Sequence, residues 1–147
     1  MDVVEHVFRL ESTWDGGRND SGKIKCGQLN TAVSIPKEMN GPGIGTNPDE
    51  MLLGAAATCY IISLATMLEY SKIKASLSLQ SEGIVHTSNN IYTYKKIIHN
   101  ITIFLQEDLD KNVRIAEKLA YKAEQSCMIS KALRGNVEII INCSIKK

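Results

Sequence analysis

Two of the four cysteines, Cys59 and Cys127, are the residues best suited to chemistry in this chain of 147 residues. Each is expected on the apolar side of a predicted helix. The first ten residues contain no apolar region of the kind a signal peptide has, so a reducing compartment is expected. Paired thiols in such a compartment are more often redox-active groups or metal ligands than structural disulfides. No zinc-binding spacing accompanies them, which favours redox chemistry.

Cys59 must ionise before it can act as a nucleophile, and burial among apolar groups raises the pKa of a thiol. The dipole of its own helix helps only within the first turn, and Cys59 lies about 16 Å beyond Pro48 at 1.5 Å per residue. A cation from elsewhere in the fold is therefore needed. The residues alone leave several candidates open: Arg9, Arg18, Arg114, Arg134 and the lysines. The alternative is a structural role, in which Cys59 is a small packing residue in the core.

Composition narrows the class of protein. The length fits one domain over residues 1–147, large enough to bury a core without disulfides or metals. The formal net charge is +1 and the basic residues are scattered, so no nucleic-acid partner is expected. Cys26 and Cys143 are expected to be packing residues on strands. The three histidines are isolated, and no metal site is expected.

One segment, Met51 to Leu68, carries no charge over 18 residues, which is the lower limit for a membrane-spanning helix. Several polar or small residues weaken that interpretation: Gly54, Thr58, Ser63 and Thr66. We expect instead a central helix surrounded by protein on every side, and no membrane partner.

Hydrophobic periodicity and turn signals predict eight elements in the order β-β-β-α-β-β-α-β, a mixed α+β fold. Asn47 caps the central helix, Pro48 takes its first position and Glu50 completes a capping-box-like pattern. Cys127 is expected on the apolar face of the second helix, which opens at Asp108 or Asp110. The expected segments are strands at 7–12 and 29–35, a loop at 14–22, a helix at 47–70, strands at 73–87 and 91–106, and a last strand at 136–145.

Four motifs in this order resemble the OsmC/Ohr family of cysteine-based organic hydroperoxide reductases. They are Gly16-Gly17-Arg18, Asn47-Pro48, the segment around Cys59, and Cys127 with Ser130, Ala132 and Arg134-Gly135-Asn136. The resemblance runs from about Trp14 to the C-terminus. It implies an OsmC-like fold, in which a bent antiparallel sheet wraps a buried central helix. It also implies an intertwined homodimer with its sites at the interface.

The resemblance also implies the roles of four catalytic residues. Cys59 would attack the peroxide as a thiolate, and Cys127 would resolve the resulting sulfenic acid into a disulfide. Arg18 would lower the pKa of Cys59, since its guanidinium is always charged and presents a fork of donors. Asp49 would orient Arg18. Two positions depart from the family pattern: Asp49 stands where Glu is usual, and Met128 follows Cys127 where Pro is usual.

The spacing of the acid and the thiol suggests how a dimer would build the site. Asp49 and Cys59 are separated by about 15 Å along one helix, so one arginine head cannot easily touch both. The acid would then come from a second, antiparallel copy of the helix. Glu50 is adjacent to Asp49 but points about 100° further round the helix, and could take its place. Both acids also suit the helix N-terminus electrostatically.

The expected function is a thiol-dependent peroxidase that reduces organic hydroperoxides to alcohols in the cytoplasm. The resemblance implies no bound cofactor, and re-reduction by an external dithiol of the lipoyl type or a lipoylated protein. Two hypotheses of other classes stay open. The chain could be a non-enzymatic binding module for a small hydrophobic ligand, which needs neither thiol, or a thiol redox sensor that signals to a partner.

Overall fold

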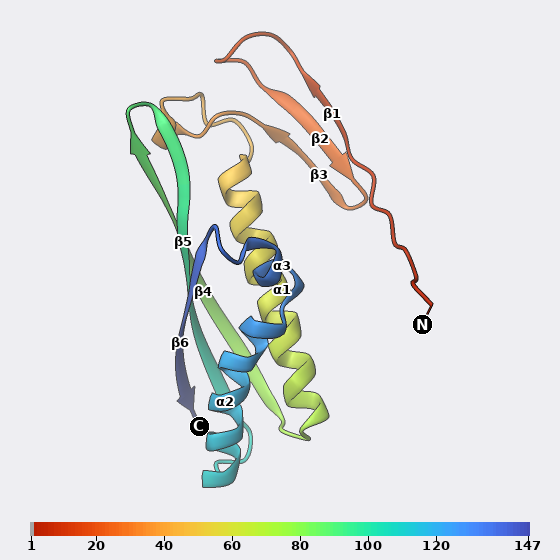
Figure 1. Cartoon of the computed structure of the whole chain (residues 1–147), viewed down its shortest axis with the longest axis vertical. Coiled ribbons are helices and arrows are strands. Elements are labelled where there is room, and N and C mark those ends of the chain that lie inside the picture. Colours follow the sequence, from red (N-terminus) through yellow and green to blue (C-terminus); the bar gives the residue numbers. More distant parts are fainter. Residues whose placement is uncertain (1) are drawn as a thin grey trace. The chain divides into compact units, whose positions relative to one another are not determined.

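The computed structural model describes residues 2–147, which form two compact units. The first extends through Met51 and the second covers Leu52–Lys147. Figure 1 shows their elements in chain order. The prediction of a single domain stays a prediction.

The first unit contains a small antiparallel sheet in the order β1-β2-β3. Its strands are β1 Glu11–Trp14, β2 Gly22–Cys26 and β3 Leu29–Val33. The turn after β1 is closed by Trp14 Nε1, which donates to Gly17 O at 2.8 Å, and by Gly17 N, which donates to Asp20 Oδ2 at 2.7 Å. The strand expected at 7–12 begins at Glu11 instead, because the short β2 offers pairing partners only for residues 11–14. A single turn of 3₁₀-helix, η1 Lys37–Met39, follows β3.

The long helix α1, Pro48–Tyr70, starts where the sequence predicts. Asn47 Oδ1 accepts from Glu50 N at 2.9 Å, and the Glu50 carboxylate accepts from Thr46 Oγ1 at 2.8 Å. Within one chain its buried residues form one stripe, Ala56, Tyr60, Leu64 and Leu68. The expectation of a helix surrounded by protein on every side stays a prediction. Among residues 2–147, α1 alone is long and apolar enough to cross a membrane, a test that core helices of soluble proteins also pass.

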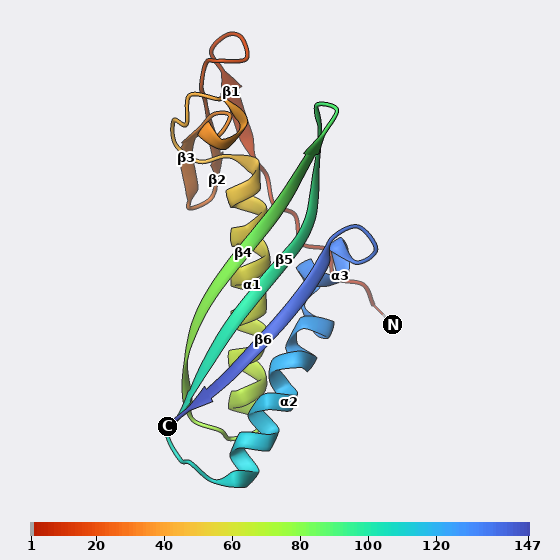
Figure 2. The same ribbon diagram turned by 90° about the vertical axis from the view of Figure 1, so that its left-hand side faces the viewer.

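The second unit is built on a long hairpin of β4, Ala75–Ser88, and β5, Ile91–Leu105. Asn89 and Asn90 form its turn with φ of 52° and 64°, a left-handed conformation that asparagine tolerates. The last strand, β6 Glu138–Lys146, lies beside β5 and runs parallel to it (Figure 2). The expected single antiparallel sheet is therefore wrong: there are two three-stranded sheets, and β6 is parallel because a helical crossover returns the chain before it pairs.

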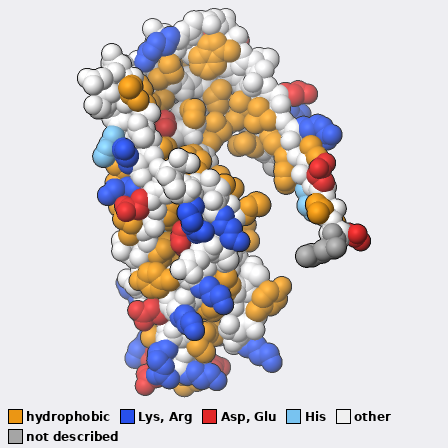
Figure 3. All heavy atoms as spheres, in the orientation of Figure 1, with side chains coloured by type: hydrophobic (Ala, Val, Ile, Leu, Met, Phe, Trp, Pro, Cys, Tyr) orange, Lys and Arg blue, Asp and Glu red, His pale blue; other side chains and the backbone are white. Residues whose placement is uncertain are grey.

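Helices α2, Asp110–Ser126, and α3, Met128–Leu133, form that crossover. The predicted order of elements lacked α3. Cys127 lies between the two helices in an extended conformation, with ψ of 126°, and is therefore not on the face of α2 as expected. Three small residues of α2, Ala116, Ala120 and Ala123, are fully buried against α1 residues and sheet isoleucines in one core cluster. On the face shown in Figure 3, acidic and basic side chains are intermixed.

Candidate redox-active cysteine pair

The structure brings Cys59 and Cys127 together within the second unit. Cys59 lies on α1 and is partly exposed, whereas Cys127 is fully buried at the junction of α2 and α3. Both are free thiols, and a hydrogen bond links their side chains. Residues 68 positions apart in sequence thus form one dithiol, positioned by two helices that meet through buried alanines.

The surroundings of Cys59 favour its thiolate. Burial raises the pKa of this thiol, but four hydrogen-bond donors act against burial and the net pKa is lowered from its ordinary value. The donors are the Cys127 thiol, the backbone N–H groups of Ile129 and Met128, and the Ser63 hydroxyl. Sequence reasoning sought a distant cation for this task and missed these neutral donors. Ser63 could have been found, because it lies one helical turn beyond Cys59.

Cys127 has the opposite tendency. Burial and the hydrogen bond with Cys59 raise its pKa, although the backbone and hydroxyl of Ser130 act in the other direction. Two neighbouring thiols whose pKa values are pushed apart can take different roles. The partly exposed Cys59 is the thiol favoured to ionise, and the buried Cys127 is the thiol favoured to keep its proton.

A buried aromatic pair supports α1 beside the thiols. Tyr60 follows Cys59 and donates its hydroxyl to Ala120 O at 2.8 Å, tying α1 to α2. Its ring stacks on that of His99, with centroids 5.0 Å apart and an angle of 7° between the planes. A hydrogen bond of 2.6 Å joins His99 Nδ1 to Ser81 Oγ. No local pattern predicts this network, because a histidine on a strand carries no information about its partner.

Arg18 and Asp49 belong to the first unit. Arg18 is exposed, and its guanidinium donates to the backbone carbonyls of Met39 at 2.9 Å and Asn40 at 3.3 Å, after η1. These hydrogen bonds join the turn after β1 to the end of η1 within this unit. Asp49 is partly buried in the first turn of α1. Their roles toward the thiols remain predictions.

The other candidate groups lie apart from the pair. Cys143 lies on β6 against the main core cluster, and burial raises its pKa. Cys26 is at the end of β2 in the first unit. Within residues 2–147, no three histidine, cysteine or acidic side chains are grouped to hold a metal ion.

The sequence of this chain is similar to a known family and to several bacterial proteins. The family model described as "OsmC-like protein" matches residues 41–142. The chain is 55% identical over 146 residues to the uncharacterized protein YmaD of Bacillus subtilis, with 98% of this chain and 97% of that protein covered. It is 27% identical to an organic hydroperoxide resistance protein of Xanthomonas axonopodis pv. citri, covering 92% of this chain and 93% of that one.

Solved structures agree with the fold. An organic hydroperoxide resistance protein OsmC from Legionella pneumophila superposes with a TM-score of 0.71 at 25% identity, covering 95% of this chain and 99% of that chain. One from Elizabethkingia anophelis, with thiocyanate bound, gives a TM-score of 0.74 at 24% identity, covering 96% and 99%. The match to the family model covers residues 41–51 of the first unit and nearly all of the second, and it includes both cysteines of the pair. The chain therefore belongs to the OsmC-like protein family.

Proposed function

We propose that this chain is a thiol-dependent peroxidase that reduces organic hydroperoxides to alcohols. One observation carries the proposal: a partly exposed thiol with a lowered pKa is hydrogen-bonded to a buried second thiol. This arrangement suits a two-cysteine peroxidase, and a packing role for the cysteines would not require it. The printed names of the Xanthomonas and Legionella relatives, organic hydroperoxide resistance proteins, support the substrate class.

The reaction follows from the two environments. The Cys59 thiolate attacks the terminal oxygen of ROOH, the O–O bond breaks, and the alkoxide leaves and takes a proton to become ROH. Cys59 is now a sulfenic acid, two electrons more oxidised. The Cys127 sulfur then attacks the Cys59 sulfur, a disulfide forms, and hydroxide leaves as water after protonation. Because the thiols are already hydrogen-bonded, the second step needs little rearrangement.

Arg18 and Asp49 complete the proposed site. Arg18 would stabilise the charge that develops on the peroxide oxygens, and Asp49, or Glu50 beside it, would hold the guanidinium. The donors around Cys59 mean that Arg18 need not supply the whole of its activation. Its main proposed task is therefore at the transition state of O–O cleavage.

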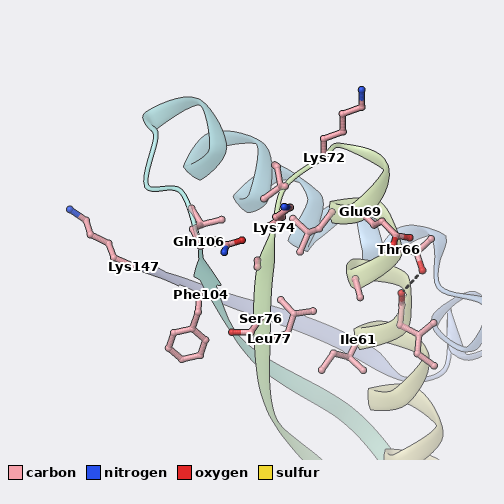
Figure 4. A pocket seen from close by; sticks show the side chains of 16 residues that line it. Ile61, Thr66, Glu69, Lys72, Lys74, Ser76, Leu77, Phe104, Gln106 and Lys147 are labelled. Carbon is pink, nitrogen blue, oxygen red and sulfur yellow. Dashed lines mark hydrogen bonds between the residues drawn. The ribbon is translucent and has the colours of Figure 1, made fainter.

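We propose that two copies of the chain form a homodimer through α1. A groove of about 1280 Å³ runs between the C-terminal half of α1 and the ends of β4 and β5 (Figure 4). Its apolar lining includes Ile61, Ile62 and Leu77, and Ile62 is 59% exposed. Exposed apolar side chains that lie together are typical of protein interfaces. A second copy of this helix, which carries no charge from Met51 to Leu68, is a matching occupant, and it would also bring a second Asp49 toward the thiols.

An external dithiol, of the lipoyl type or carried by a lipoylated protein, is the proposed reductant. It would return the disulfide to two thiols, and the cycle would need no bound metal, haem or flavin. The chemistry requires a compartment that keeps thiols reduced, which supports the cytoplasm.

Turnover of cumene hydroperoxide with a dithiol tests the proposal. The native protein should turn over many times, and Cys59→Ser should lose activity. Cys26→Ser is the matched control and should keep it. Full activity in Cys59→Ser would contradict the proposal. Oxidation without turnover would favour the redox sensor, and peroxide-independent binding of an apolar ligand by a Cys59→Ser, Cys127→Ser variant would favour the binding module.

A further inference from the structure

The reductive half of the cycle is also encoded in this site. We propose that the external dithiol attacks the Cys59 sulfur of the disulfide, and that the Ser130 hydroxyl donates to the Cys127 thiolate that leaves. The inference rests on the proposed peroxidase function and assigns a catalytic role to Ser130, a residue in the first turn of α3.

Accessibility decides which sulfur is attacked. Thiol–disulfide exchange needs the incoming thiolate to approach the sulfur along the line of the S–S bond, so the attacked sulfur must be reachable. Cys59 is partly exposed on α1, and Cys127 has no exposed surface. The reductant therefore forms its mixed disulfide with Cys59, and Cys127 is the leaving group.

A buried leaving group needs a donor. A thiolate released in an apolar interior is disfavoured, which would slow reduction. Ser130 is 1% exposed and lies three residues after Cys127, and its hydroxyl faces the Cys127 sulfur. No partner within residues 2–147 meets hydrogen-bond geometry with this hydroxyl, although it is near enough to the Cys127 sulfur to act against the rise in the pKa of that thiol.

An unpaired buried hydroxyl is costly, and native proteins rarely keep one without a reason. A neutral thiol or disulfide sulfur is a weak acceptor, whereas a thiolate is a strong one. The Ser130 hydroxyl thus obtains its full partner only when Cys127 is ionised. That state occurs at the moment of disulfide cleavage.

The step balances with a dithiol as the reductant. Its first thiolate bonds to the Cys59 sulfur, the Cys59–Cys127 bond breaks, and its electron pair stays on Cys127. The second thiol of the reductant, once ionised, then attacks the reductant sulfur of the mixed disulfide and releases the Cys59 thiolate. The reductant leaves as a cyclic disulfide, and its two protons are available to Cys127 and to the solvent.

Trapping with a monothiol tests the point of attack on the native protein. The disulfide is made with diamide, exposed briefly to 2-mercaptoethanol, quenched in acid and alkylated, and its peptides are mapped by mass spectrometry. The adduct should be on Cys59 and the alkyl group on Cys127. An adduct on Cys127 would overturn this inference and leave the peroxidase proposal standing. Failure of peroxide to generate any disulfide would count against the proposed function instead.

The role of Ser130 is tested by the rate at which dithiothreitol reduces the preformed disulfide. Ser130→Ala should slow reduction on the order of tenfold, since a hydrogen bond to a charged group is lost. It should change the rate of peroxide attack on Cys59 far less. Ser126→Ala, which removes an exposed hydroxyl bonded to Lys122 O, is the matched control and should leave both rates unchanged.

Two further readouts separate donation from packing. In a Cys59→Ser background, Ser130→Ala should raise the pKa of Cys127, measured by thiolate absorbance against pH. Ser130→Thr, which keeps the hydroxyl, should restore rapid reduction. Unchanged reduction in Ser130→Ala, or an unchanged Cys127 pKa, would overturn the role of the hydroxyl. The monothiol experiment uses native protein and stands even where a Ser130 variant fails to fold.

Discussion

Acid should destabilise this protein through His99, and the effect can be calculated. His99 is fully buried, and burial lowers its pKa to about 4 from an ordinary 6.5. In the unfolded chain the imidazole binds a proton near pH 6.5, and in the folded chain it does not until pH falls to about 4. The unfolded state therefore binds more protons between these values. The contribution of His99 to stability is complete above that window and is lost as pH falls through it.

The size of the effect follows from the two pKa values. One unit of pKa difference corresponds to about 1.4 kcal/mol, so His99 should cost about 2 kcal/mol of unfolding free energy between about pH 7 and about pH 4.5. That is a large share of the stability of a small domain. The stacked Tyr60 stays neutral throughout, because burial raises its pKa.

His99→Asn isolates the contribution of this group. The amide can keep the hydrogen bond to Ser81 but cannot titrate. Urea unfolding of the native protein and the variant is measured at both pH values. The stability difference between them should shrink by about 2 kcal/mol at the lower pH, since other groups titrate in both and cancel. An equal difference at both pH values would refute the reasoning, and would mean that His99 is protonated or hydrated in the native state.

Three further predictions concern the proposed site. Arg18→Ala should lower peroxide turnover by about 10²- to 10³-fold, as steady-state kinetics would show. The loss of its hydrogen bonds to Met39 and Asn40 should lower the free energy of unfolding by only about 1 kcal/mol, measured by urea unfolding. Near-native turnover would assign the role to another cation. Organic hydroperoxides should exceed hydrogen peroxide by at least about tenfold in kcat/KM, because buried methylenes add binding; equal values would refute an apolar substrate channel. Ile62→Glu should convert a dimer to monomers in analytical ultracentrifugation, whereas Lys118→Glu on α2 should not; a monomeric native protein would contradict the proposed interface.

Local signals in the sequence were sufficient for much of the fold. Asn47 and Pro48 fixed the start of α1, and the paired asparagines Asn89 and Asn90 fixed the hairpin turn. These features act over a few residues, so they can be read directly. The direction of β6 could not be read, because it depends on where the crossover helices return the chain. The sequence also could not predict which faces of α1 its own chain leaves uncovered, because the same apolar pattern results whether its own chain or another copy covers the helix.

The candidate site was predictable only where local sequence motifs identify its residues. The family resemblance paired Cys59 with Cys127, and in the structure a hydrogen bond joins their side chains. Their catalytic roles stay predictions. The conformation of Cys127 was not predictable, because the break between α2 and α3 carries no Gly or Pro signal at that position. The donors Ser63 and Ser130 were missed because their partners come into reach only after the helices pack. Long-range contacts of this kind determine the pKa values on which the chemistry depends.

The formation of one particular disulfide tests the central claim most directly. The reduced protein is treated with one equivalent of cumene hydroperoxide, alkylated, digested without reductant and mapped by mass spectrometry. The account predicts an intramolecular Cys59–Cys127 disulfide, formed in proportion to the alcohol released. Oxidation confined to Cys26 or Cys143, with Cys59 and Cys127 still alkylated as free thiols, would contradict it.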